Sequence, residues 1–322
     1  MKKIFLAFLM LSMFTLTGCG AAQKNADNAT PTGNPAGIST ETPAQGTLTV
    51  KVLDVGQGDA ILIKTAEETV LIDASDIDER DKLRRELEKA GVSVIDKVIL
   101  THPHADHIGG MDLLLKNYDV KAVYDNDIMR DQPIYLSYLR ELKKRNLTRQ
   151  TLKAGDTLSF GGGATFSVIS PDEKSVSAWN NEFQTYLKNK KTDKSTPKPK
   201  HNFNMESIVG LLTFGDFTML LTGDAEKEIE IGLVKKYGDK LRSNILKSPH
   251  HGSKTSSSPE FLDKVAPEAA IISLGAGNDY GHPHAVTLKK YDSRGIKTYR
   301  TDTDGTVTII SDGKTYEIAA EK

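Results

Sequence analysis

The sequence has one cysteine, almost no net charge and only one extended apolar run. With a single cysteine among 322 residues the chain cannot form an internal disulfide, so a disulfide-stabilised scaffold is excluded. The 42 Lys and Arg residues nearly cancel the 43 Asp and Glu residues, so no global attraction to nucleic acid is expected and any such binding must be local. With 38% hydrophobic residues, the composition is nevertheless that of a folded chain rather than a disordered one.

The apolar run covers residues 4–16 and follows two lysines. It is too short for a stable membrane-spanning helix and fits the core of a signal peptide. It ends in LTGC, which resembles a bacterial lipobox, so residues 1–18 are expected to be removed and Cys19 to carry a lipid; an ordinary secretory signal is the alternative. Residues 19–46 are expected to form a flexible tether. The expected location is the outer face of the cytoplasmic membrane, held there by the lipid alone.

Short apolar stretches alternate with amphipathic ones from residue 47 onward. Strands are predicted at 48–52, 60–63, 70–72, 98–100, 120–124, 165–169, 207–213, 217–221, 244–247, 269–274, 297–300, 306–310 and 315–318, and helices at 78–90, 108–117, 132–145, 225–237, 258–265 and 285–294. This order indicates one α/β domain over 47–322, with two sheets and helices outside them. The lysine-rich segment 188–200 is expected to be an exposed loop, which either guides a polyanion or is a solvated insertion without function.

Three histidines and an aspartate follow the strand predicted to end at residue 100. Within six residues the chain places His102, His104, Asp106 and His107. Burying them unpaired would cost on the order of several kcal/mol each. Imidazole and carboxylate groups are, however, the ligands of zinc and similar divalent ions. A turn at this point can direct the first two side chains at one ion and the last two at another.

Other predicted strands also end near histidine or aspartate. Asp224 can bridge two ions through its two carboxylate oxygens, although alone it would be interpreted as a helix N-cap. The pair His250 and His251 follows after room for one helix and one strand, which returns one of the two to the same sheet edge. His282 and His284 lie in a further loop. Seven of the eight histidines therefore lie in three loops that follow predicted strands.

These motifs resemble those of the metallo-β-lactamase-fold hydrolases, and more closely the extracellular hydrolase domain of the competence proteins of the ComEC type. The matching strings are LDVGQGDA (53–60), THPHADHIGG (101–110), LTGD (221–224), HHGS (250–253) and YGHPH (280–284). The resemblance implies an αββα sandwich of two mixed β-sheets flanked by helices, with a dinuclear site at one sheet edge. It also implies phosphodiester hydrolysis, with DNA the expected substrate, by a free-standing, lipid-anchored relative. A monomer is expected.

Carried over residue by residue, the resemblance implies a ligand set. The first metal is held by His102 and His104, the second by Asp106, His107 and His250, and Asp224 bridges the two. Two zinc ions are expected, with manganese as the alternative. The wider family has one more histidine ligand, which is missing here; Asn204 takes its place, His201 is expected to be exposed, and occupancy by one ion stays open. Asp73 ends a strand where the family has an aspartate that orients the ligand loop.

The implied chemistry is metal-assisted hydrolysis. Catalytic roles are expected for Asp106, Asp224, His251 and His284, and substrate binding for Asn204, Ser253 and His282. Alternatively, His251 hydrogen-bonds a ligand and His282 caps a turn. An extracellular nuclease acting on DNA is therefore the expected function. The alternatives are a phosphodiesterase for small or cell-wall esters such as phosphocholine, and a non-enzymatic binding lipoprotein, which is disfavoured because only one ligand is missing.

Overall fold

The computed structural model describes residues 46–322, so Cys19, the predicted signal peptide and residues 19–45 of the predicted tether lie outside the described residues. The strands are β1 (Leu48–Val52), β2 (Ile61–Lys64), β3 (Thr69–Ile72), β4 (Val94–Ile99), β5 (Asp119–Asp125), β6 (Arg149–Thr151), β7 (Thr157–Ser159), β8 (Thr165–Ser170), β9 (Val209–Phe214), β10 (Phe217–Leu221), β11 (Ile245–Lys247), β12 (Ala269–Ile272), β13 (Lys297–Arg300), β14 (Val307–Ser311) and β15 (Tyr316–Ala320).

The α-helices of the described range are α1 (Arg80–Lys89), α2 (Ala105–Ile108), α3 (Met111–Asn117), α4 (Pro133–Lys144), α5 (Glu173–Thr192), α6 (Lys227–Tyr237), α7 (Pro259–Val265), α8 (Ala285–Asp292) and α9 (Thr301–Asp304). Short 3-10 helices are η1 (Ile77–Glu79), η2 (Phe203–Glu206), η3 (Gly238–Leu241) and η4 (Pro249–Gly252). Over residues 46–322, none of these helices combines the length and the apolar character that crossing a membrane requires.

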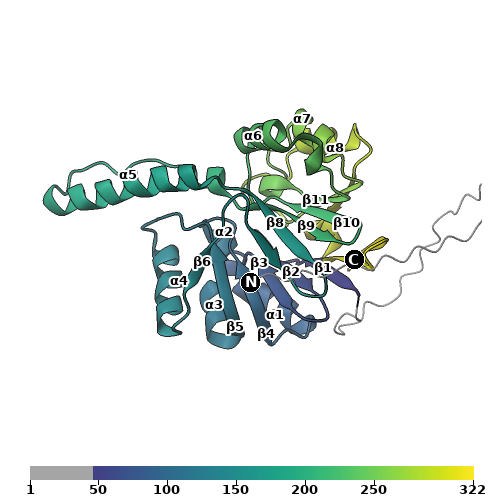
Figure 1. Cartoon of the computed structure of the whole chain (residues 1–322), viewed down its shortest axis with the longest axis horizontal. Coiled ribbons are helices and arrows are strands. Elements are labelled where there is room, and N and C mark those ends of the chain that lie inside the picture. The colour runs from purple at the N-terminus through teal and green to yellow at the C-terminus, as the bar shows by residue number, and fades with distance from the viewer. Residues whose placement is uncertain (1–45) are drawn as a thin grey trace, which may run out of the picture. The chain divides into compact units, whose positions relative to one another are not determined.

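The strands form two mixed sheets that pack face to face (Figure 1). One sheet has the order β15-β14-β1-β2-β3-β4-β5-β6, and the other has the order β13-β12-β11-β10-β9-β8-β7. Alternation along β1 directs Val50 and Val52 inward, where they are fully buried, and leaves Lys51 half-buried. Leu212 and Met219 of the second sheet belong to the same buried cluster. The interior between the sheets is therefore apolar, because each sheet directs every second side chain into it.

Helices cover the outer face of each sheet. Leu83 and Leu87, four residues apart on α1, are buried against the first sheet in a cluster that also holds residues of α3 and α4. The second sheet carries α6, α7 and α8, and Phe261 and Tyr291 are the largest buried side chains of that layer. The predicted αββα sandwich is therefore confirmed.

One end of both sheets collects the segments that follow parallel strands. In the first sheet β3, β4, β5 and β6 are parallel neighbours, and in the second β10, β11, β12 and β13 are. The carboxyl ends of parallel neighbours lie at the same sheet edge, so the loops after β3, β4, β10, β11 and β12 converge there. These loops contain the predicted metal ligands.

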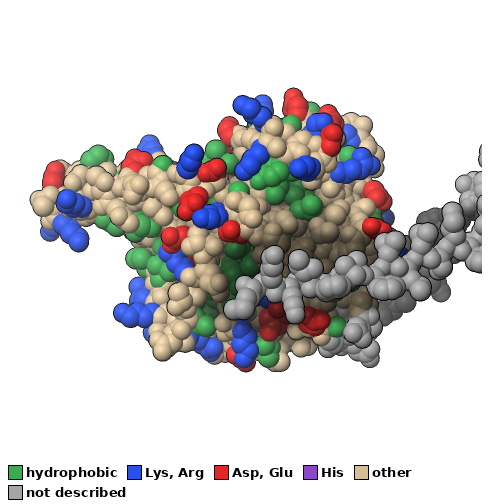
Figure 2. All heavy atoms as spheres, in the orientation of Figure 1, with side chains coloured by type: hydrophobic (Ala, Val, Ile, Leu, Met, Phe, Trp, Pro, Cys, Tyr) green, Lys and Arg blue, Asp and Glu red, His purple; other side chains and the backbone are tan. Residues whose placement is uncertain are grey.

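Helix α5 was not predicted, and the expectation of a loop over 188–200 is wrong for residues 188–192, which complete this helix. Its buried side chains, Val176, Trp179, Phe183 and Tyr186, recur at helical spacing and pack with Ile128. All six lysines of 188–200 are exposed. In Figure 1 the helix extends sideways from the sheets, and Figure 2 shows Lys and Arg side chains at its outer end.

Candidate metal centre

Asp73 anchors the loop that carries four of the predicted ligands. It follows β3, is completely buried, and has a positive φ of 62°. Its Oδ1 accepts a hydrogen bond from the Thr101 backbone N–H (2.7 Å), and its Oδ2 accepts one from Thr101 Oγ1 (2.7 Å). The same Oδ2 lies 2.7 Å from His107 Nδ1. A proton on Nδ1 satisfies this contact and makes Nε2 the His107 nitrogen that is available to an ion at the sheet edge.

Two groups of potential ligands share Asp224. In one group, Asp106, His107, Asp224 and His251 offer ligand atoms that lie within 4.8 Å of one another; in the other, His102, His104 and Asp224 do so. His107 Nε2 and His251 Nε2 lie 3.3 and 3.4 Å from the two carboxylate oxygens of Asp224. On the other side, His102 Nε2 lies 3.8 Å from Asp224 Oδ2. One carboxylate therefore connects the two groups, as a bridging ligand between two ions requires.

The ligand atoms are buried and unsatisfied, which tests whether divalent ions fit. Within the described part of the chain, His107 Nε2, His251 Nε2 and Asp224 Oδ1 have no hydrogen-bond partner, although they lie close together. A buried polar atom left unpaired costs about 1–3 kcal/mol, and three of them converging on one point indicate a missing partner. Two nitrogens and carboxylate oxygens are the donor set that zinc and related ions bind. The residues therefore fit a binuclear metal site.

The pKa values of the first histidine pair favour ligation. Burial lowers the pKa of His102 well below its usual range and lowers that of His104 to about 4. Both imidazoles are therefore neutral at physiological pH and keep a lone pair for an ion. Burial has the same effect on His107, but the carboxylates of Asp224 and Asp106 outweigh it and hold the pKa of His107 well above the usual value. An ion with its positive charge would take the place of that proton.

The structure brings His251, rather than His250, into the second ligand group. His251 Nδ1 donates to the Ser273 carbonyl (2.8 Å), so Nε2 is free and lies 3.3 Å from Asp106 Oδ2. The His250 ring is turned so that its Nδ1 faces Thr255 Oγ1 at 3.1 Å. Consecutive left-handed backbone conformations, with φ of 48° and 52°, direct the two rings differently. His250 Nε2 still lies 3.8 Å from Asp224 Oδ2, so the geometry favours His251 as the ligand while the ligand role of His250 stays a prediction.

Asn204, the residue expected in place of an additional histidine, lies beside the clustered ligands. Asn204 is buried in η2 and lines the cavity at the site, and its Oδ1 has no hydrogen-bond partner within the described range. His201 is not exposed as expected. Its Nε2 lies 2.6 Å from Glu206 Oε2, and its ring stacks on Trp179 at 4.2 Å between centroids. The pairing directs His201 away from the clustered ligands, so Asn204 remains the residue that faces them.

Sequence reasoning missed one buried ion pair beside the ligands. Lys247 Nζ lies 2.9 Å from Asp59 Oδ2, and both side chains are essentially inaccessible to solvent. The other oxygen of Asp59 lies 3.5 Å from His251 Nδ1. The loop that carries Asp59 packs directly against the backbone of Asp106. This packing requires glycine at position 58, because Gly58 has a φ of 112° and a Cβ there would lie 2.2 Å from the Asp106 carbonyl oxygen. Two features of the sequence could have indicated this ion pair. They are the two glycines of GQGD and the lysine within the apolar strand that precedes HHGS.

A cavity of about 300 Å³ opens at the cluster. Its lining residues are Gln57, Asp76, His104, Ala105, Asp106, Asn204, Asp224, His250, His251, Tyr280 and His282. Among the described residues, no Lys or Arg lines it. Of the expected substrate-binding residues, Asn204 and His282 line the cavity. Ser253 is buried with its Oγ 3.0 Å from Thr255 Oγ1, and His284 precedes α8 with its Nδ1 accepting from the Lys254 N–H.

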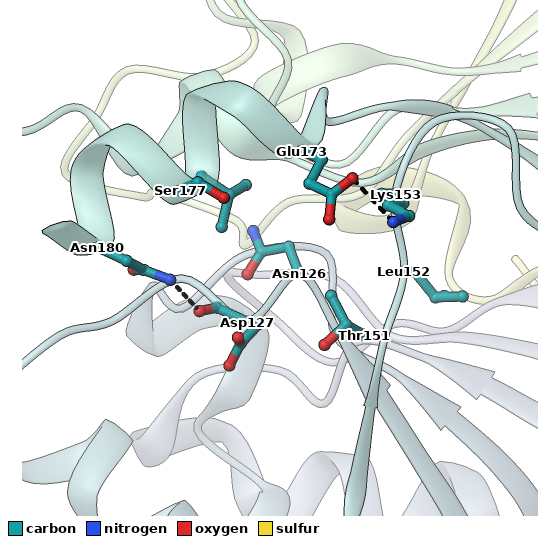
Figure 3. Close-up of a pocket in the computed structure, with 9 residues that line it drawn as sticks. Asn126, Asp127, Thr151, Leu152, Lys153, Glu173, Ser177 and Asn180 are labelled. Atoms are coloured by element: carbon teal, nitrogen blue, oxygen red, sulfur yellow. Dashed lines mark hydrogen bonds and ion pairs between the residues drawn. The ribbon is translucent and has the colours of Figure 1, made fainter.

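A second polar cavity of about 250 Å³ lies beside the amino-terminal part of α5 (Figure 3). Lys153 and Glu173 form an ion pair at 2.9 Å, and Asn180 donates to the Asp127 carbonyl at 2.9 Å. Asn126 connects this region to the segments next to His102 and Asn204, because its Nδ2 donates to the Thr101 carbonyl (3.3 Å) and to the Glu206 carbonyl (2.7 Å). The polar groups here pair with one another, and none of the clustered ligands lines this cavity.

The two packed sheets and the shared His/Asp cluster at their common edge define a metallo-beta-lactamase-fold hydrolase with a site for divalent ions. Residues 53–276 match the family model described as the metallo-beta-lactamase superfamily, and the chain belongs to this family.

Among proteins of known sequence, the chain is 29% identical over 276 residues to ComE operon protein 3 of Bacillus subtilis, a match that covers 80% of this chain and 32% of that protein. It is 30% identical over 257 residues to competence protein ComA of Neisseria gonorrhoeae, covering 80% and 31%. The chain thus spans about a third of the length of these relatives. Among solved structures, YhfI of Bacillus subtilis, a metallo-beta-lactamase fold protein, superposes with a TM-score of 0.51 at 13% identity, covering 82% of this chain and 99% of that one.

Proposed function

We propose that this protein is a metal-dependent phosphodiesterase that hydrolyses DNA outside the cytoplasm. The observation that carries the proposal is the pair of ligand groups joined by Asp224, because a shared carboxylate between two divalent ions is the arrangement that in-line displacement at phosphorus uses. One relative named above, ComA of Neisseria gonorrhoeae, is a competence protein, and its similarity over 80% of this chain supports a nucleic acid as substrate. When bound, divalent ions supply a Lewis acid for the phosphoryl oxygens and a lower pKa for a nearby water.

The protein's own residues prepare the cavity for this reaction. Burial opposes the ionised form of Asp106, but His107 and His251 outweigh it and hold the pKa of this carboxyl well below its usual range. The carboxylate therefore stays ionised at the cavity wall, where it can bind an ion and accept a hydrogen bond from water. Burial and the neighbouring histidines lower the pKa of His282 to about 4. His282 is therefore neutral at physiological pH and suited to hydrogen-bond a phosphate rather than to supply a proton.

Cleavage assays test the proposal directly. The unit to use is residues 46–322 with added zinc or manganese, and the substrates are single-stranded DNA, duplex DNA and bis(4-nitrophenyl) phosphate. We expect DNA cleavage that is lost in His104→Ala and in Asp224→Ala, because each removes one ligand. Asp239→Ala, which changes an exposed aspartate outside the cavity, should behave like wild type. Cleavage of the small reporter alone would overturn the nuclease assignment, and full activity of both ligand variants would overturn the metal assignment.

A phosphocholine esterase is the second candidate, because the cavity rim has chemistry that suits a quaternary ammonium group. Asp76 and the exposed Tyr280 lie at the cavity, and no Lys or Arg of the described chain competes there. Carboxylates and aromatic faces together bind such cations. Hydrolysis of 4-nitrophenyl phosphocholine at a much higher kcat/KM than bis(4-nitrophenyl) phosphate, without DNA cleavage, would favour this candidate.

The lysine-rich segment 188–200 is proposed to guide the polyanion. Its six lysines are exposed, and only Lys198 forms an ion pair, with Asp131, in the described chain. Replacing the other five lysines with glutamine should raise the KM for DNA and flatten its dependence on salt, while leaving the small reporter unaffected. An unchanged salt slope would mean that the segment is a solvated insertion.

The proposed lipid anchor is tested separately, by loss of palmitate labelling and of membrane association in Cys19→Ser.

A further inference from the structure

Tyr280 is the outermost of three stacked rings that lead from the metal centre to solvent. Its ring stacks on His282 at 5.6 Å between centroids with an interplanar angle of 19°. His282 in turn stacks on the ligand His251 at 6.2 Å and 26°. Tyr280 is 62% exposed, the most exposed large apolar side chain of the described residues, although it lines the cavity. One face of its ring therefore covers His282 and the other is open.

The loop that carries Tyr280 is held in place before any ligand arrives. Asn278 closes the loop from within, since its Nδ2 donates to the His282 carbonyl (2.8 Å) and its Oδ1 accepts from the His282 N–H (2.9 Å). At the loop's ends, the His284 N–H donates to the Gly252 carbonyl (3.0 Å), and the Gly275 N–H donates to Gln57 Oε1 (3.3 Å). A ring presented by a fixed loop loses little conformational entropy on binding, which makes its exposed face an effective contact surface.

The charged side chains of the cavity limit the contacts that it can make with a polymeric substrate. Ions at the clustered ligands would hold the scissile phosphate, but no Lys or Arg of the described chain lines the cavity to hold the adjacent phosphates there. The lysines of 188–200 would act outside the cavity, so a contact inside it with the nucleotide next to the scissile phosphate cannot come from a side-chain cation. Stacking of bases on aromatic rings is the contact that single-stranded nucleic acids use, and it tolerates any sequence because every base has a flat face.

We propose that the open face of Tyr280 is a stacking platform for a nucleobase next to the scissile phosphate, so that the preferred substrate is single-stranded nucleic acid. The proposal rests on the proposed phosphodiesterase function and narrows its substrate class. In a duplex the bases are already stacked on one another, and their faces are unavailable to Tyr280 without local melting. The platform therefore favours strands whose bases are unpaired.

The test compares a single-stranded oligodeoxynucleotide with an abasic oligomer that has the same phosphodiester backbone. The quantity measured is the ratio of kcat/KM for the two, so that a general change in activity or in folded protein cancels. Wild type should prefer the substrate with bases, and Tyr280→Ala should reduce this preference by about 5- to 100-fold. Tyr280→Phe keeps the ring and should restore it. Ile231→Ala, which removes another exposed apolar side chain outside the cavity, is the matched control and should keep the wild-type ratio.

The outcomes separate this proposal from the function on which it rests. If wild type cleaves neither oligomer, the nuclease function and the platform both fall. If wild type cleaves both equally, or if Tyr280→Ala keeps the preference, the nuclease function stands and the platform is refuted. Loss of the preference in Tyr280→Phe as well as in Tyr280→Ala would also contradict stacking, because it would assign the effect to the hydroxyl group.

Discussion

The buried ion pair between Lys247 and Asp59 gives the sharpest test of how the site is supported. Both side chains have an exposed fraction of at most 1%, and within residues 46–322 the Lys247 ammonium has two partners, Asp59 Oδ2 at 2.9 Å and the Ser248 carbonyl at 3.1 Å. Replacing Lys247 with Met keeps the length and the apolar stem, but it leaves the Asp59 carboxylate buried without its cation. Breaking a buried pair in this way costs about 3–5 kcal/mol of unfolding free energy, much more than losing an exposed pair.

The assay is urea unfolding followed by circular dichroism, in a cycle of four proteins. Lys247→Met and Asp59→Asn should each be strongly destabilising. The double variant should be more stable than the sum of the two losses predicts, by about 1–3 kcal/mol, because neither partner is then left charged and unpaired. Lys264→Met, which removes the exposed pair with Asp239, is the control and should not measurably move the unfolding midpoint.

Two results would refute this reasoning. Strict additivity of the two losses would mean that the charges do not depend on each other. An effect of Lys247→Met as small as that of Lys264→Met would mean that water reaches Asp59.

The same variants also report on the metal centre, since Asp59 Oδ1 lies 3.5 Å from His251 Nδ1. A weakening of zinc binding by roughly 10- to 100-fold in Asp59→Asn, measured by competition with a chelating dye, is the expected consequence of losing support for a ligand.

Three further predictions concern the ligands. His251→Ala should lower the number of ions bound per chain, as measured by metal analysis after dialysis, whereas His250→Ala should keep it; the reverse result would restore the original assignment. Asp73→Asn should weaken zinc binding by roughly 10- to 100-fold, because His107 loses the carboxylate that fixes its ring, and unchanged affinity would contradict that role. Chelation should lower the melting temperature, and saturation at 100 times Kd should restore about 2.7 kcal/mol; Asp224→Ala should remove most of that difference.

The clustering of the candidate ligands could be predicted from the sequence where the relevant information is local. His102, His104, Asp106 and His107 lie within six residues after a strand, and parallel strands bring such loops to one edge whatever their side chains. Sequence spacing could not choose between His250 and His251, because the choice depends on two left-handed backbone conformations rather than on a periodic pattern.

Helix α5 and the ion pair of Lys247 were not predicted, for different physical reasons. The apolar residues of α5 do recur at helical spacing, from Val176 to Tyr186, but the lysines and prolines that follow made the region resemble a loop. The ion pair of Lys247 was hidden for another reason. A lysine at the end of a short apolar strand is ordinarily assigned to the surface, and its burial becomes intelligible only with Asp59, which is far away in the sequence.

The distribution of the ligands explains why the residues around them are buried so deeply. One sheet supplies the ligands that follow β4, the other supplies Asp224 and His251, and their free lone pairs meet at the edge between the sheets. Without ions, that edge would hold carboxylates and unsatisfied nitrogens at close range, so ion binding and the stability of this edge are linked. The positioning contacts come from the protein itself: the Thr101 N–H donates to Asp73, and His251 donates to the Ser273 carbonyl. Contacts within the protein therefore orient the ligands, as a tight and geometrically defined metal site requires.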